Sequence, residues 1–166
     1  GDNGEILSAG KEGELEVRGS SVFPGYLDNP EANLSSFEDS GWFRTGDIAV
    51  LDEDGNVTIT GRIKDIINRG GVKYNPLEIE EIIVTHPKVE MTAIVPMPDP
   101  VLGEKACCFV QLVAGNKMTL EELTAYLGTK KISKNKWPER LQILDEMPLT
   151  PTRKIMKGSL SASLGE

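Results

Sequence analysis

The stretch Gly61-Arg62-Ile63-Lys64-Asp65-Ile66-Ile67-Asn68-Arg69-Gly70-Gly71 divides this chain into two parts, because the net charge of the sequence changes there. Residues 1–62 carry 13 acidic and 4 basic side chains, for a net charge of −9. Residues 63–166 carry 13 acidic and 14 basic side chains, for a net charge of +1. A break of this size is typical of two different structural units. We therefore expect a domain boundary between residues 62 and 63, with the quoted stretch as the connection.

Helix and strand signals alternate after this stretch. Asn75-Pro76-Leu77-Glu78 combines a capping Asn, a Pro at the first helical position and a Glu that can reach back to the cap, which predicts a helix start. Thr119-Leu120-Glu121-Glu122 is the capping box of a second helix. From residue 63 the expected order is strand, helix, strand, strand, helix, strand, helix, which indicates a compact α+β domain. The principal strand signals are the apolar runs 91–96, 105–113 and 140–144.

The residues before the boundary predict strands with little to cover them. Residues 14–17 alternate polar and apolar side chains, and the Asp-Gly turn within 52–55 joins the apolar runs 42–51 and 56–60 into a predicted hairpin. Sixty residues rarely support a sheet layer alone, and this half offers only one short helix signal, Asn29-Pro30-Glu31, in which Asn would cap the helix and Pro would take its first position. We therefore expect residues 1–62 to be the end of a larger β-rich body.

The composition argues against several classes of protein. The net charge of −8 and the sequence pI near 4.8 argue against a general nucleic-acid binder. No apolar run approaches the roughly 20 residues that a membrane-spanning helix needs. The start Gly1-Asp2-Asn3-Gly4-Glu5 lacks the basic and apolar stretches of a signal peptide. It also lacks an initiating Met, so we expect the chain to begin inside a longer protein.

The cysteines and the single histidine indicate a reduced protein without a zinc site. Cys107 and Cys108 are adjacent, which disfavours a mutual disulfide because neighbouring strand residues point to opposite faces. His86 is the only histidine, so a Cys/His zinc site lacks ligands, and we assign no metal ligand in this chain. A cytoplasmic location is the expectation that follows.

Three segments could carry chemistry, and each also has a purely structural explanation. In the run Trp42-Phe43-Arg44-Thr45-Gly46-Asp47, Asp47 could accept hydrogen bonds from the vicinal hydroxyls of a ribose, or could be an exposed turn carboxylate. Gly70-Gly71 could bring backbone close to a ligand, or could form a tight turn. Lys154, in the Pro-rich stretch 148–155, could place a compact cation beside phosphate oxygens, or could be a solvated lysine.

In this order and spacing, the three segments resemble the C-terminal third of the adenylate-forming superfamily. This superfamily includes acyl-CoA synthetases, aryl acid–AMP ligases, luciferases and the adenylation domains of peptide synthetases. Residues 42–47 are similar to its aromatic-x-Arg-Thr-Gly-Asp motif, residues 61–80 to its hinge and glycine-loop motif, and residues 151–155 to its terminal lysine motif. The resemblance covers essentially the whole chain and favours the C-terminal portion of an acyl-CoA synthetase.

The resemblance implies a fold for each half of the chain. Residues 1–62 would be the end of the large N-terminal domain, a β-rich segment of its barrel subdomain. Residues 63–166 would be the mobile C-terminal lid domain, with a three-stranded sheet, helices and a short hairpin. In the family the phosphate loop, the Thr-Glu motif that meets Mg²⁺ and the acyl pocket lie upstream, so we expect this chain to be inactive alone.

The resemblance also implies a reaction in two steps. A carboxylate and ATP give an acyl-adenylate and pyrophosphate, and CoA then gives the acyl-CoA thioester. The implied substrates and cofactors are a small-molecule carboxylate, ATP, CoA and Mg²⁺, with the Mg²⁺ ligands outside this chain and fatty-acid metabolism as the expected context. The implied partner is the upstream N-terminal domain of the same protein.

Six residues acquire roles from the resemblance. Asp47 would accept hydrogen bonds from the ribose hydroxyls of ATP and of the acyl-adenylate, and Arg62 would contact the same ribose region. Lys64 occupies the hinge position, about which the C-terminal domain rotates between the two half-reactions. The pair Gly70 and Gly71 would form the loop that enters the active site for the second half-reaction, beside the pantetheine arm of CoA.

The sixth residue, Lys154, would be the catalytic lysine of the first half-reaction, where it bridges the carboxylate and the α-phosphate. The sequence departs from the family immediately before it, because Arg153 stands where the family usually has Gly. Arg lacks the backbone freedom of Gly. We therefore expect either an altered loop geometry or a subgroup with another backbone conformation.

Two other functions stay open. The sequence Asn68-Arg69-Gly70-Gly71 also resembles the corresponding segment of aryl acid–AMP ligases. The chain could therefore belong to such a ligase or to an adenylation domain that loads a carrier protein. The missing phosphate loop, the short length and Arg153 instead motivate a non-catalytic nucleotide-binding or regulatory module that kept the fold.

Overall fold

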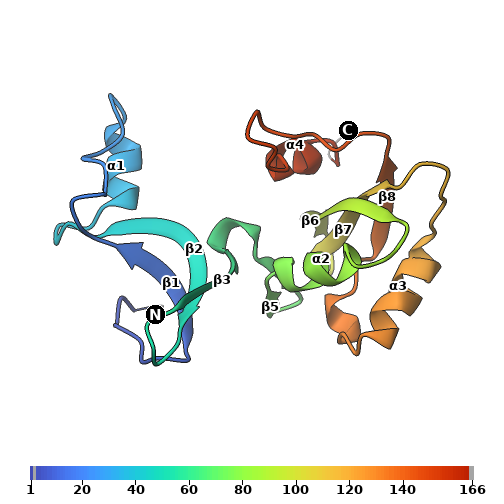
Figure 1. Ribbon diagram of the computed structural model, residues 1–166, viewed down its shortest axis with the longest axis horizontal. Coiled ribbons are helices and arrows are strands. Elements are labelled where there is room, and N and C mark those ends of the chain that lie inside the picture. The colour runs from blue at the N-terminus through green and yellow to red at the C-terminus, as the bar shows by residue number, and fades with distance from the viewer. Residues whose placement is uncertain (2, 165–166) are drawn as a thin grey trace. The chain divides into compact units, whose positions relative to one another are not determined.

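The computed structural model describes residues 1 and 3–164, and the chain forms two compact units, Gly1–Lys64 (unit 1) and Asp65–Glu166 (unit 2) (Figure 1). The division lies two residues after the boundary that the charge pattern indicated. The larger domains to which the units belong stay a prediction.

Unit 1 is built around an antiparallel sheet with the strand order β1-β2-β3. The predicted β2–β3 hairpin is confirmed, and Asp52 closes its turn by accepting hydrogen bonds from the backbone of Asp54 and Asn56. The side chain of Asn29 accepts a hydrogen bond from the Ala32 amide at 3.1 Å, so the predicted helix cap is confirmed as well. The elements are β1 (Glu12–Val17), α1 (Pro30–Ser36), β2 (Phe43–Leu51) and β3 (Val57–Arg62).

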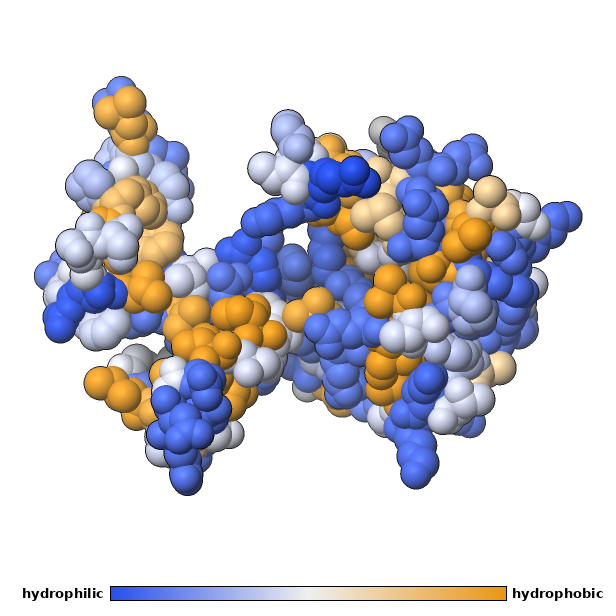
Figure 2. Space-filling model, viewed as in Figure 1, coloured by the Kyte–Doolittle hydropathy of each residue, from blue (hydrophilic) through white to orange (hydrophobic). Residues whose placement is uncertain are grey.

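Very little of unit 1 is buried. Among its described residues, Ala49 is the one buried hydrophobic side chain, whereas Leu51, Val57 and Ile59 of the sheet are each more than 40% exposed. Figure 2 shows apolar side chains gathered on the visible surface of this unit. The sheet therefore has no covering layer among the described residues of unit 1.

Unit 2 contains a five-stranded sheet. Strands β5-β4-β7-β6 form the main path, and β8 pairs in parallel with β7. The long strands β6 and β7 pair with each other, and together with β8 they form the expected three-stranded sheet, to which the short β4–β5 hairpin adds. The elements are the turn η1 (Ile63–Asp65), which begins in unit 1, then β4 (Ile67–Arg69), β5 (Val72–Tyr74), α2 (Leu77–Ile83), β6 (Val89–Asp99), β7 (Gly103–Leu112), α3 (Leu120–Thr129), η2 (Lys134–Lys136), β8 (Arg140–Leu144) and α4 (Lys157–Ala162).

Both faces of this sheet are covered, because alternate strand residues pack against different helices. Ile94 and Cys108 face one core, which α2 and α3 complete with Ile79 and Leu123. The neighbouring positions on β6 and β7 face a second core, which α4 completes with Leu160. The predicted α+β fold is therefore confirmed for unit 2.

Both cysteines lie in these cores as free thiols. Burial raises the pKa of Cys107 to about 11 and the pKa of Cys108 to about 12. Both groups therefore stay protonated at neutral pH and behave as small apolar side chains. Among the described residues, no helix is long and apolar enough to cross a membrane.

The start of α2 differs from the prediction. Asn75 accepts a hydrogen bond from the Leu77 amide at 3.1 Å, as a cap does, but Pro76 has helical torsions and lies just before the helix. The carboxylate of Glu78 does not reach back to the cap; it pairs with Lys136 Nζ at 2.6 Å. The expectation of a reciprocal cap was wrong, because a tertiary cation competes for that carboxylate.

Candidate functional site

Asp47 and Arg62 meet in unit 1 because the β2–β3 register pairs them directly. Arg62 Nε lies 2.9 Å from Asp47 Oδ1, and Arg62 Nη2 donates to the carbonyl of Thr45 at 2.9 Å. The hydroxyl of Thr45 accepts a hydrogen bond from the Asp47 amide at 3.0 Å and donates to the Leu15 carbonyl at 2.7 Å. The ion pair is therefore fixed by the sheet and by Thr45, a residue to which the sequence analysis gave no role.

This pair combines an acceptor with donors at a partly open surface. The Asp47 side chain is 33% exposed and that of Arg62 is 48% exposed. Within the part of the chain that the structure describes, Asp47 Oδ2 accepts no hydrogen bond and makes no ion pair. A carboxylate oriented by a guanidinium can accept hydrogen bonds from a vicinal diol. The geometry is therefore suited to a ribose.

The β4–β5 hairpin presents the two glycines at its tip. Arg69 pairs with Val72, so Gly70 and Gly71 form a two-residue turn, with φ angles of +59° and +87°. Positive φ at both positions is the requirement of a type I′ turn, which favours glycine. A Cβ on Gly70 would also lie 3.2 Å from the side chain of Leu102. The turn is therefore tight, exposed to solvent and free of side chains.

The base of this turn is anchored by β4 and by two other segments of unit 2. Gly71 donates its amide to the side chain of Asn68 at 3.1 Å, and Gly70 donates to the carbonyl of Leu102 at 2.8 Å. Arg69 Nε pairs with Glu139 at 2.5 Å, and the other oxygen of Glu139 accepts the Ala106 amide. The backbone of the turn is thus held in one position relative to unit 2.

Lys154 lies on a small bulged hairpin loop in unit 2. The carbonyl of Thr150 accepts a hydrogen bond from the Arg153 amide at 2.8 Å, and the Thr150 amide donates to the Lys154 carbonyl at 2.8 Å. The Thr150 hydroxyl accepts the Lys154 amide at 3.0 Å. Residues 151–153 therefore form a three-residue hairpin loop, whose last position normally has positive φ.

Arg153 occupies that last position with a φ of +63°. Glycine is the usual residue in a left-handed conformation, and an arginine there costs roughly 1–2 kcal/mol. The backbone at Arg153 therefore takes a conformation that suits glycine, with the arginine strained in it. The hydrogen bonds of Thr150 fix the loop, and the side chain of Lys154 is exposed.

Lys64 lies at the end of unit 1, whereas the glycine turn belongs to unit 2. Lys64 is exposed within the turn η1 and is the last residue of unit 1, beside the division between the units. Within unit 2, the glycine turn and the Lys154 loop are not brought together: β5 and α4 lie far apart in the view of Figure 1. Unit 2 thus presents two separate candidate surfaces.

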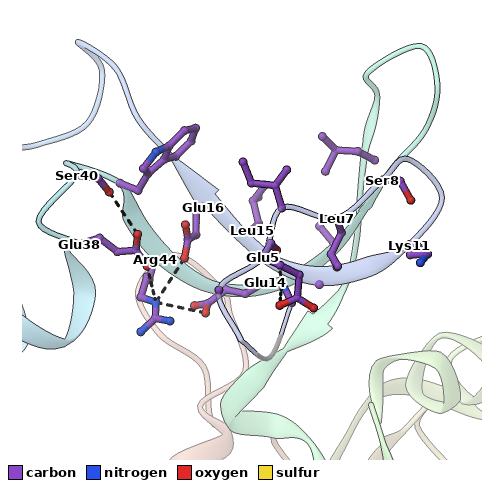
Figure 3. A pocket seen from close by; sticks show the side chains of 17 residues that line it. Glu5, Leu7, Ser8, Lys11, Glu14, Leu15, Glu16, Glu38, Ser40 and Arg44 are labelled. Atoms are coloured by element: carbon purple, nitrogen blue, oxygen red, sulfur yellow. Dashed lines mark hydrogen bonds and ion pairs between the residues drawn. The ribbon is translucent and has the colours of Figure 1, made fainter.

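A hollow of about 430 Å³ in unit 1 contains none of the predicted site residues (Figure 3). Its wall includes Arg44, whose Nε lies 3.5–4.0 Å from carboxylate oxygens of Glu14, Glu16 and Glu38. Within residues 1 and 3–164, no group of three or more His, Cys, Asp or Glu side chains could hold a metal ion.

Comparison with known proteins identifies relatives over nearly the whole chain. Residues 78–154 match the AMP-binding enzyme C-terminal domain. A medium-chain fatty-acid–CoA ligase of Escherichia coli K12 is 40% identical over 157 residues, which are 94% of this chain and 28% of that ligase. A salicyl-AMP ligase/salicyl-S-ArCP synthetase of Mycobacterium tuberculosis is 37% identical over 163 residues, 98% of this chain and 29% of that protein.

The solved structures agree. ATP-bound MatB from Rhodopseudomonas palustris superposes with a TM-score of 0.87 at 33% identity, over 95% of this chain and 31% of that protein. The chain therefore spans less than a third of the length of the relatives that it matches. It belongs to the adenylate-forming, AMP-binding enzymes and corresponds to their C-terminal portion.

Proposed function

We propose that the protein carrying this chain is an ATP-dependent carboxylate–CoA ligase. It would join a carboxylate and ATP into an acyl-adenylate with release of pyrophosphate, and then transfer the acyl group to the thiol of CoA. The observation that carries this proposal is the exposed Lys154, presented on a loop whose backbone is fixed by Thr150.

The first half-reaction needs charge neutralisation at the reacting atoms. A carboxylate oxygen attacks the α-phosphorus of ATP, and both groups are negatively charged. An ammonium group placed between them lowers this repulsion and orients the carboxylate, and no proton has to move. Lys154 is suited to this role because its position is set by the bulged loop.

Asp47 and Arg62 are the proposed ribose contacts. The carboxylate oxygen of Asp47 that Arg62 does not engage would accept hydrogen bonds from the ribose hydroxyls, and Arg62 would keep the carboxylate oriented. Unit 1 would therefore hold the nucleoside in both half-reactions, as the end of the large domain.

The second half-reaction would use the other surface of unit 2. The turn of Gly70 and Gly71 has no side chains, so its backbone could lie against the narrow pantetheine arm of CoA. Lys64 lies where the two units divide, which supports its proposed role as the hinge residue between the two half-reactions.

The cofactors and the location follow from the same proposal. Mg²⁺, when bound, would neutralise charge on the ATP phosphates. The described residues lack a carboxylate cluster for it, so its ligands are assigned to the upstream domain of the same protein. The free thiols of Cys107 and Cys108 support the expected cytoplasmic location.

The decisive experiment changes Lys154 to Ala in the intact enzyme. We expect ATP–pyrophosphate exchange to fall by about 10²–10³-fold, because one preorganised charge at the reaction centre is lost. Thioester formation from supplied acyl-adenylate and CoA should stay near the wild-type rate. The matched control is Lys117→Ala, another exposed lysine of unit 2. Wild-type rates of both half-reactions in Lys154→Ala would show that Lys154 is not the catalytic lysine.

The acceptor thiol decides between CoA and a carrier protein. Both kinds of ligase are relatives at similar identity, as the names of the Escherichia coli and Mycobacterium tuberculosis proteins show. Supplying acyl-adenylate with either CoA or a phosphopantetheinylated carrier protein, and identifying the thioester by mass spectrometry, separates them. We expect CoA to be acylated; exclusive acylation of the carrier protein would favour the alternative. An intact protein that binds AMP but exchanges no pyrophosphate would instead be a non-catalytic module.

A further inference from the structure

One lysine of unit 2 lies between two carboxylates from different elements. Lys157, the first residue of α4, places its Nζ 2.7 Å from Glu80 Oε1 and 3.5 Å from Asp65 Oδ2. The three side chains are only 22%, 11% and 19% exposed, respectively. Glu80 belongs to α2, and Asp65 follows Lys64 directly in the turn η1. This ion-pair triad therefore joins three separate elements.

Glu80 is the fixed member of the triad. The oxygen that faces Lys157 also accepts a hydrogen bond from the Ile94 amide of β6 at 2.6 Å. A buried carboxylate held by the sheet gives a rigid point of attachment. Glu80 therefore holds the Lys157 ammonium in a fixed position relative to the central sheet of unit 2.

The segment between Lys157 and Lys154 is itself constrained. Met156 donates its amide to the carbonyl of Pro148 at 2.9 Å, and Ile155 forms a bridge with Leu149. Both residues between Lys154 and Lys157 are thus held by backbone contacts. A displacement of the first turn of α4 would therefore also displace the lysine loop.

Lys157 neutralises the charge of two carboxylates, those of Glu80 and Asp65. Without its ammonium, two largely buried carboxylates would be left without their shared cation, and the burial of unpaired charge is costly. The elements that carry Glu80 and Asp65 would then separate or rearrange. The rest of α4 has an independent anchor, since Leu160 is 3% exposed in the second core. Loss of Lys157 should therefore shift the lysine loop without unfolding the unit.

We propose that Lys157 is a positioning residue for the adenylation half-reaction: with Glu80 and Asp65 it holds the loop that carries Lys154. This inference rests on the proposed role of Lys154. Lys157 touches neither substrate nor the reacting atoms; it acts by fixing where the catalytic ammonium lies.

The test uses Lys157→Met and Lys157→Arg in the intact enzyme, with Lys154→Ala measured in parallel. Met keeps most of the length of the side chain and removes the charge, so kcat of ATP–pyrophosphate exchange should fall by about 10–100-fold, as for a misplaced reacting group, with KM for ATP nearly unchanged. Thioester formation from supplied acyl-adenylate should change by less than about threefold, because it uses the other surface of unit 2. Arg should restore most of the exchange activity.

The matched control is Lys136→Met. Lys136 is 29% exposed and pairs with Glu78 of the same helix α2 at 2.6 Å, but lies on η2, away from the lysine loop. We expect its exchange kinetics to stay at the wild-type level, with a smaller fall in melting temperature than in Lys157→Met, because Glu78 is 52% exposed and Glu80 only 11%.

Each other outcome has a definite meaning. Wild-type exchange in Lys157→Met beside an inactive Lys154→Ala would overturn the positioning role and leave the proposed function intact. Equal losses in both half-reactions would reduce Lys157 to a structural residue. An active Lys154→Ala would refute the proposed function instead. If Lys157→Met does not fold, Asp65→Asn replaces it: a selective loss of exchange supports the inference, and unchanged exchange contradicts it.

Discussion

The two units of this chain differ in how they are stabilised. Unit 1 has a regular three-stranded sheet but buries one hydrophobic side chain, Ala49, among its described residues. Unit 2 covers both faces of its sheet, and all other buried hydrophobic residues of the described chain lie there. Strand pairing alone does not stabilise a sheet in water; burial of one face does. Unit 2 has the features of an independent domain, whereas unit 1 lacks them.

This difference also separates the two kinds of candidate site. The Asp47–Arg62 pair lies on the sheet of unit 1 and depends on strand register. The Lys154 loop and the glycine turn lie on unit 2, where a packed core holds their bases. A unit with its own core can move as a rigid body and carry both loops with it, as the proposed alternation between half-reactions requires.

The largest expected effect comes from expressing the units separately. Residues 65–166 should fold alone, with a cooperative thermal transition, and residues 1–64 should not, because they bury too little apolar surface to offset the loss of chain entropy. Dispersion of amide resonances in ¹H–¹⁵N spectra and circular dichroism melting provide the measurement. A dispersed spectrum and a cooperative melt for residues 1–64 would contradict the comparison.

An intermediate effect is expected when one apolar side chain of each sheet is shortened. Phe109 is 1% exposed, and Phe109→Ala should destabilise unit 2 by about 3–5 kcal/mol through the lost contacts and the cavity. Ile59 is 45% exposed, and Ile59→Ala should cost less than about 1 kcal/mol and leave the unfolding of unit 2 unchanged.

Urea unfolding of the whole chain, followed by fluorescence in a Trp42→Phe background, measures how each substitution changes the unfolding of unit 2. The remaining Trp137 packs against the first core of unit 2 and reports on that unit. If Ile59→Ala lowered the urea midpoint of unit 2 as much as Phe109→Ala does, the sheet of unit 1 would be part of the same cooperative unit.

The smallest expected effect concerns the strained turn of unit 2. Arg153→Gly should stabilise residues 65–166 by about 1 kcal/mol, because glycine adopts the φ of +63° without a steric penalty. Urea unfolding reported by Trp137 is again suitable. Arg153→Ala is the control, since it removes the long side chain and keeps the Cβ; an equal gain from Ala would show that backbone strain is not the cause.

Much of the fold could be predicted from local sequence. The Asn29 cap, the Thr119 cap and the Asp-Gly hairpin turn depend on neighbouring residues, and the structure contains all three. The strand β8 has the predicted bounds, 140–144. The hairpin partner β5 had no signal of its own, because three residues are too few for a period to appear.

The candidate site was predictable in part. The motifs identified Asp47 and Arg62, and strand register then brought the two residues together. The supporting roles of Thr45 and Thr150 carried no separate signal, since a hydroxyl that caps a nearby amide resembles any exposed threonine. The sequence correctly indicated that position 153 was unusual, and the structure showed that its backbone is strained.

The sequence by itself determined the identity and order of the chemical groups, the alternation of helix and strand after residue 63, and the charge break between the two halves. These properties follow from composition and from contacts within a few residues. Only the tertiary structure decided that Glu78 pairs with Lys136 and that Lys157 joins Glu80 and Asp65. Such pairs connect residues tens of positions apart, and which cation reaches which carboxylate depends on how the helices pack on the sheet.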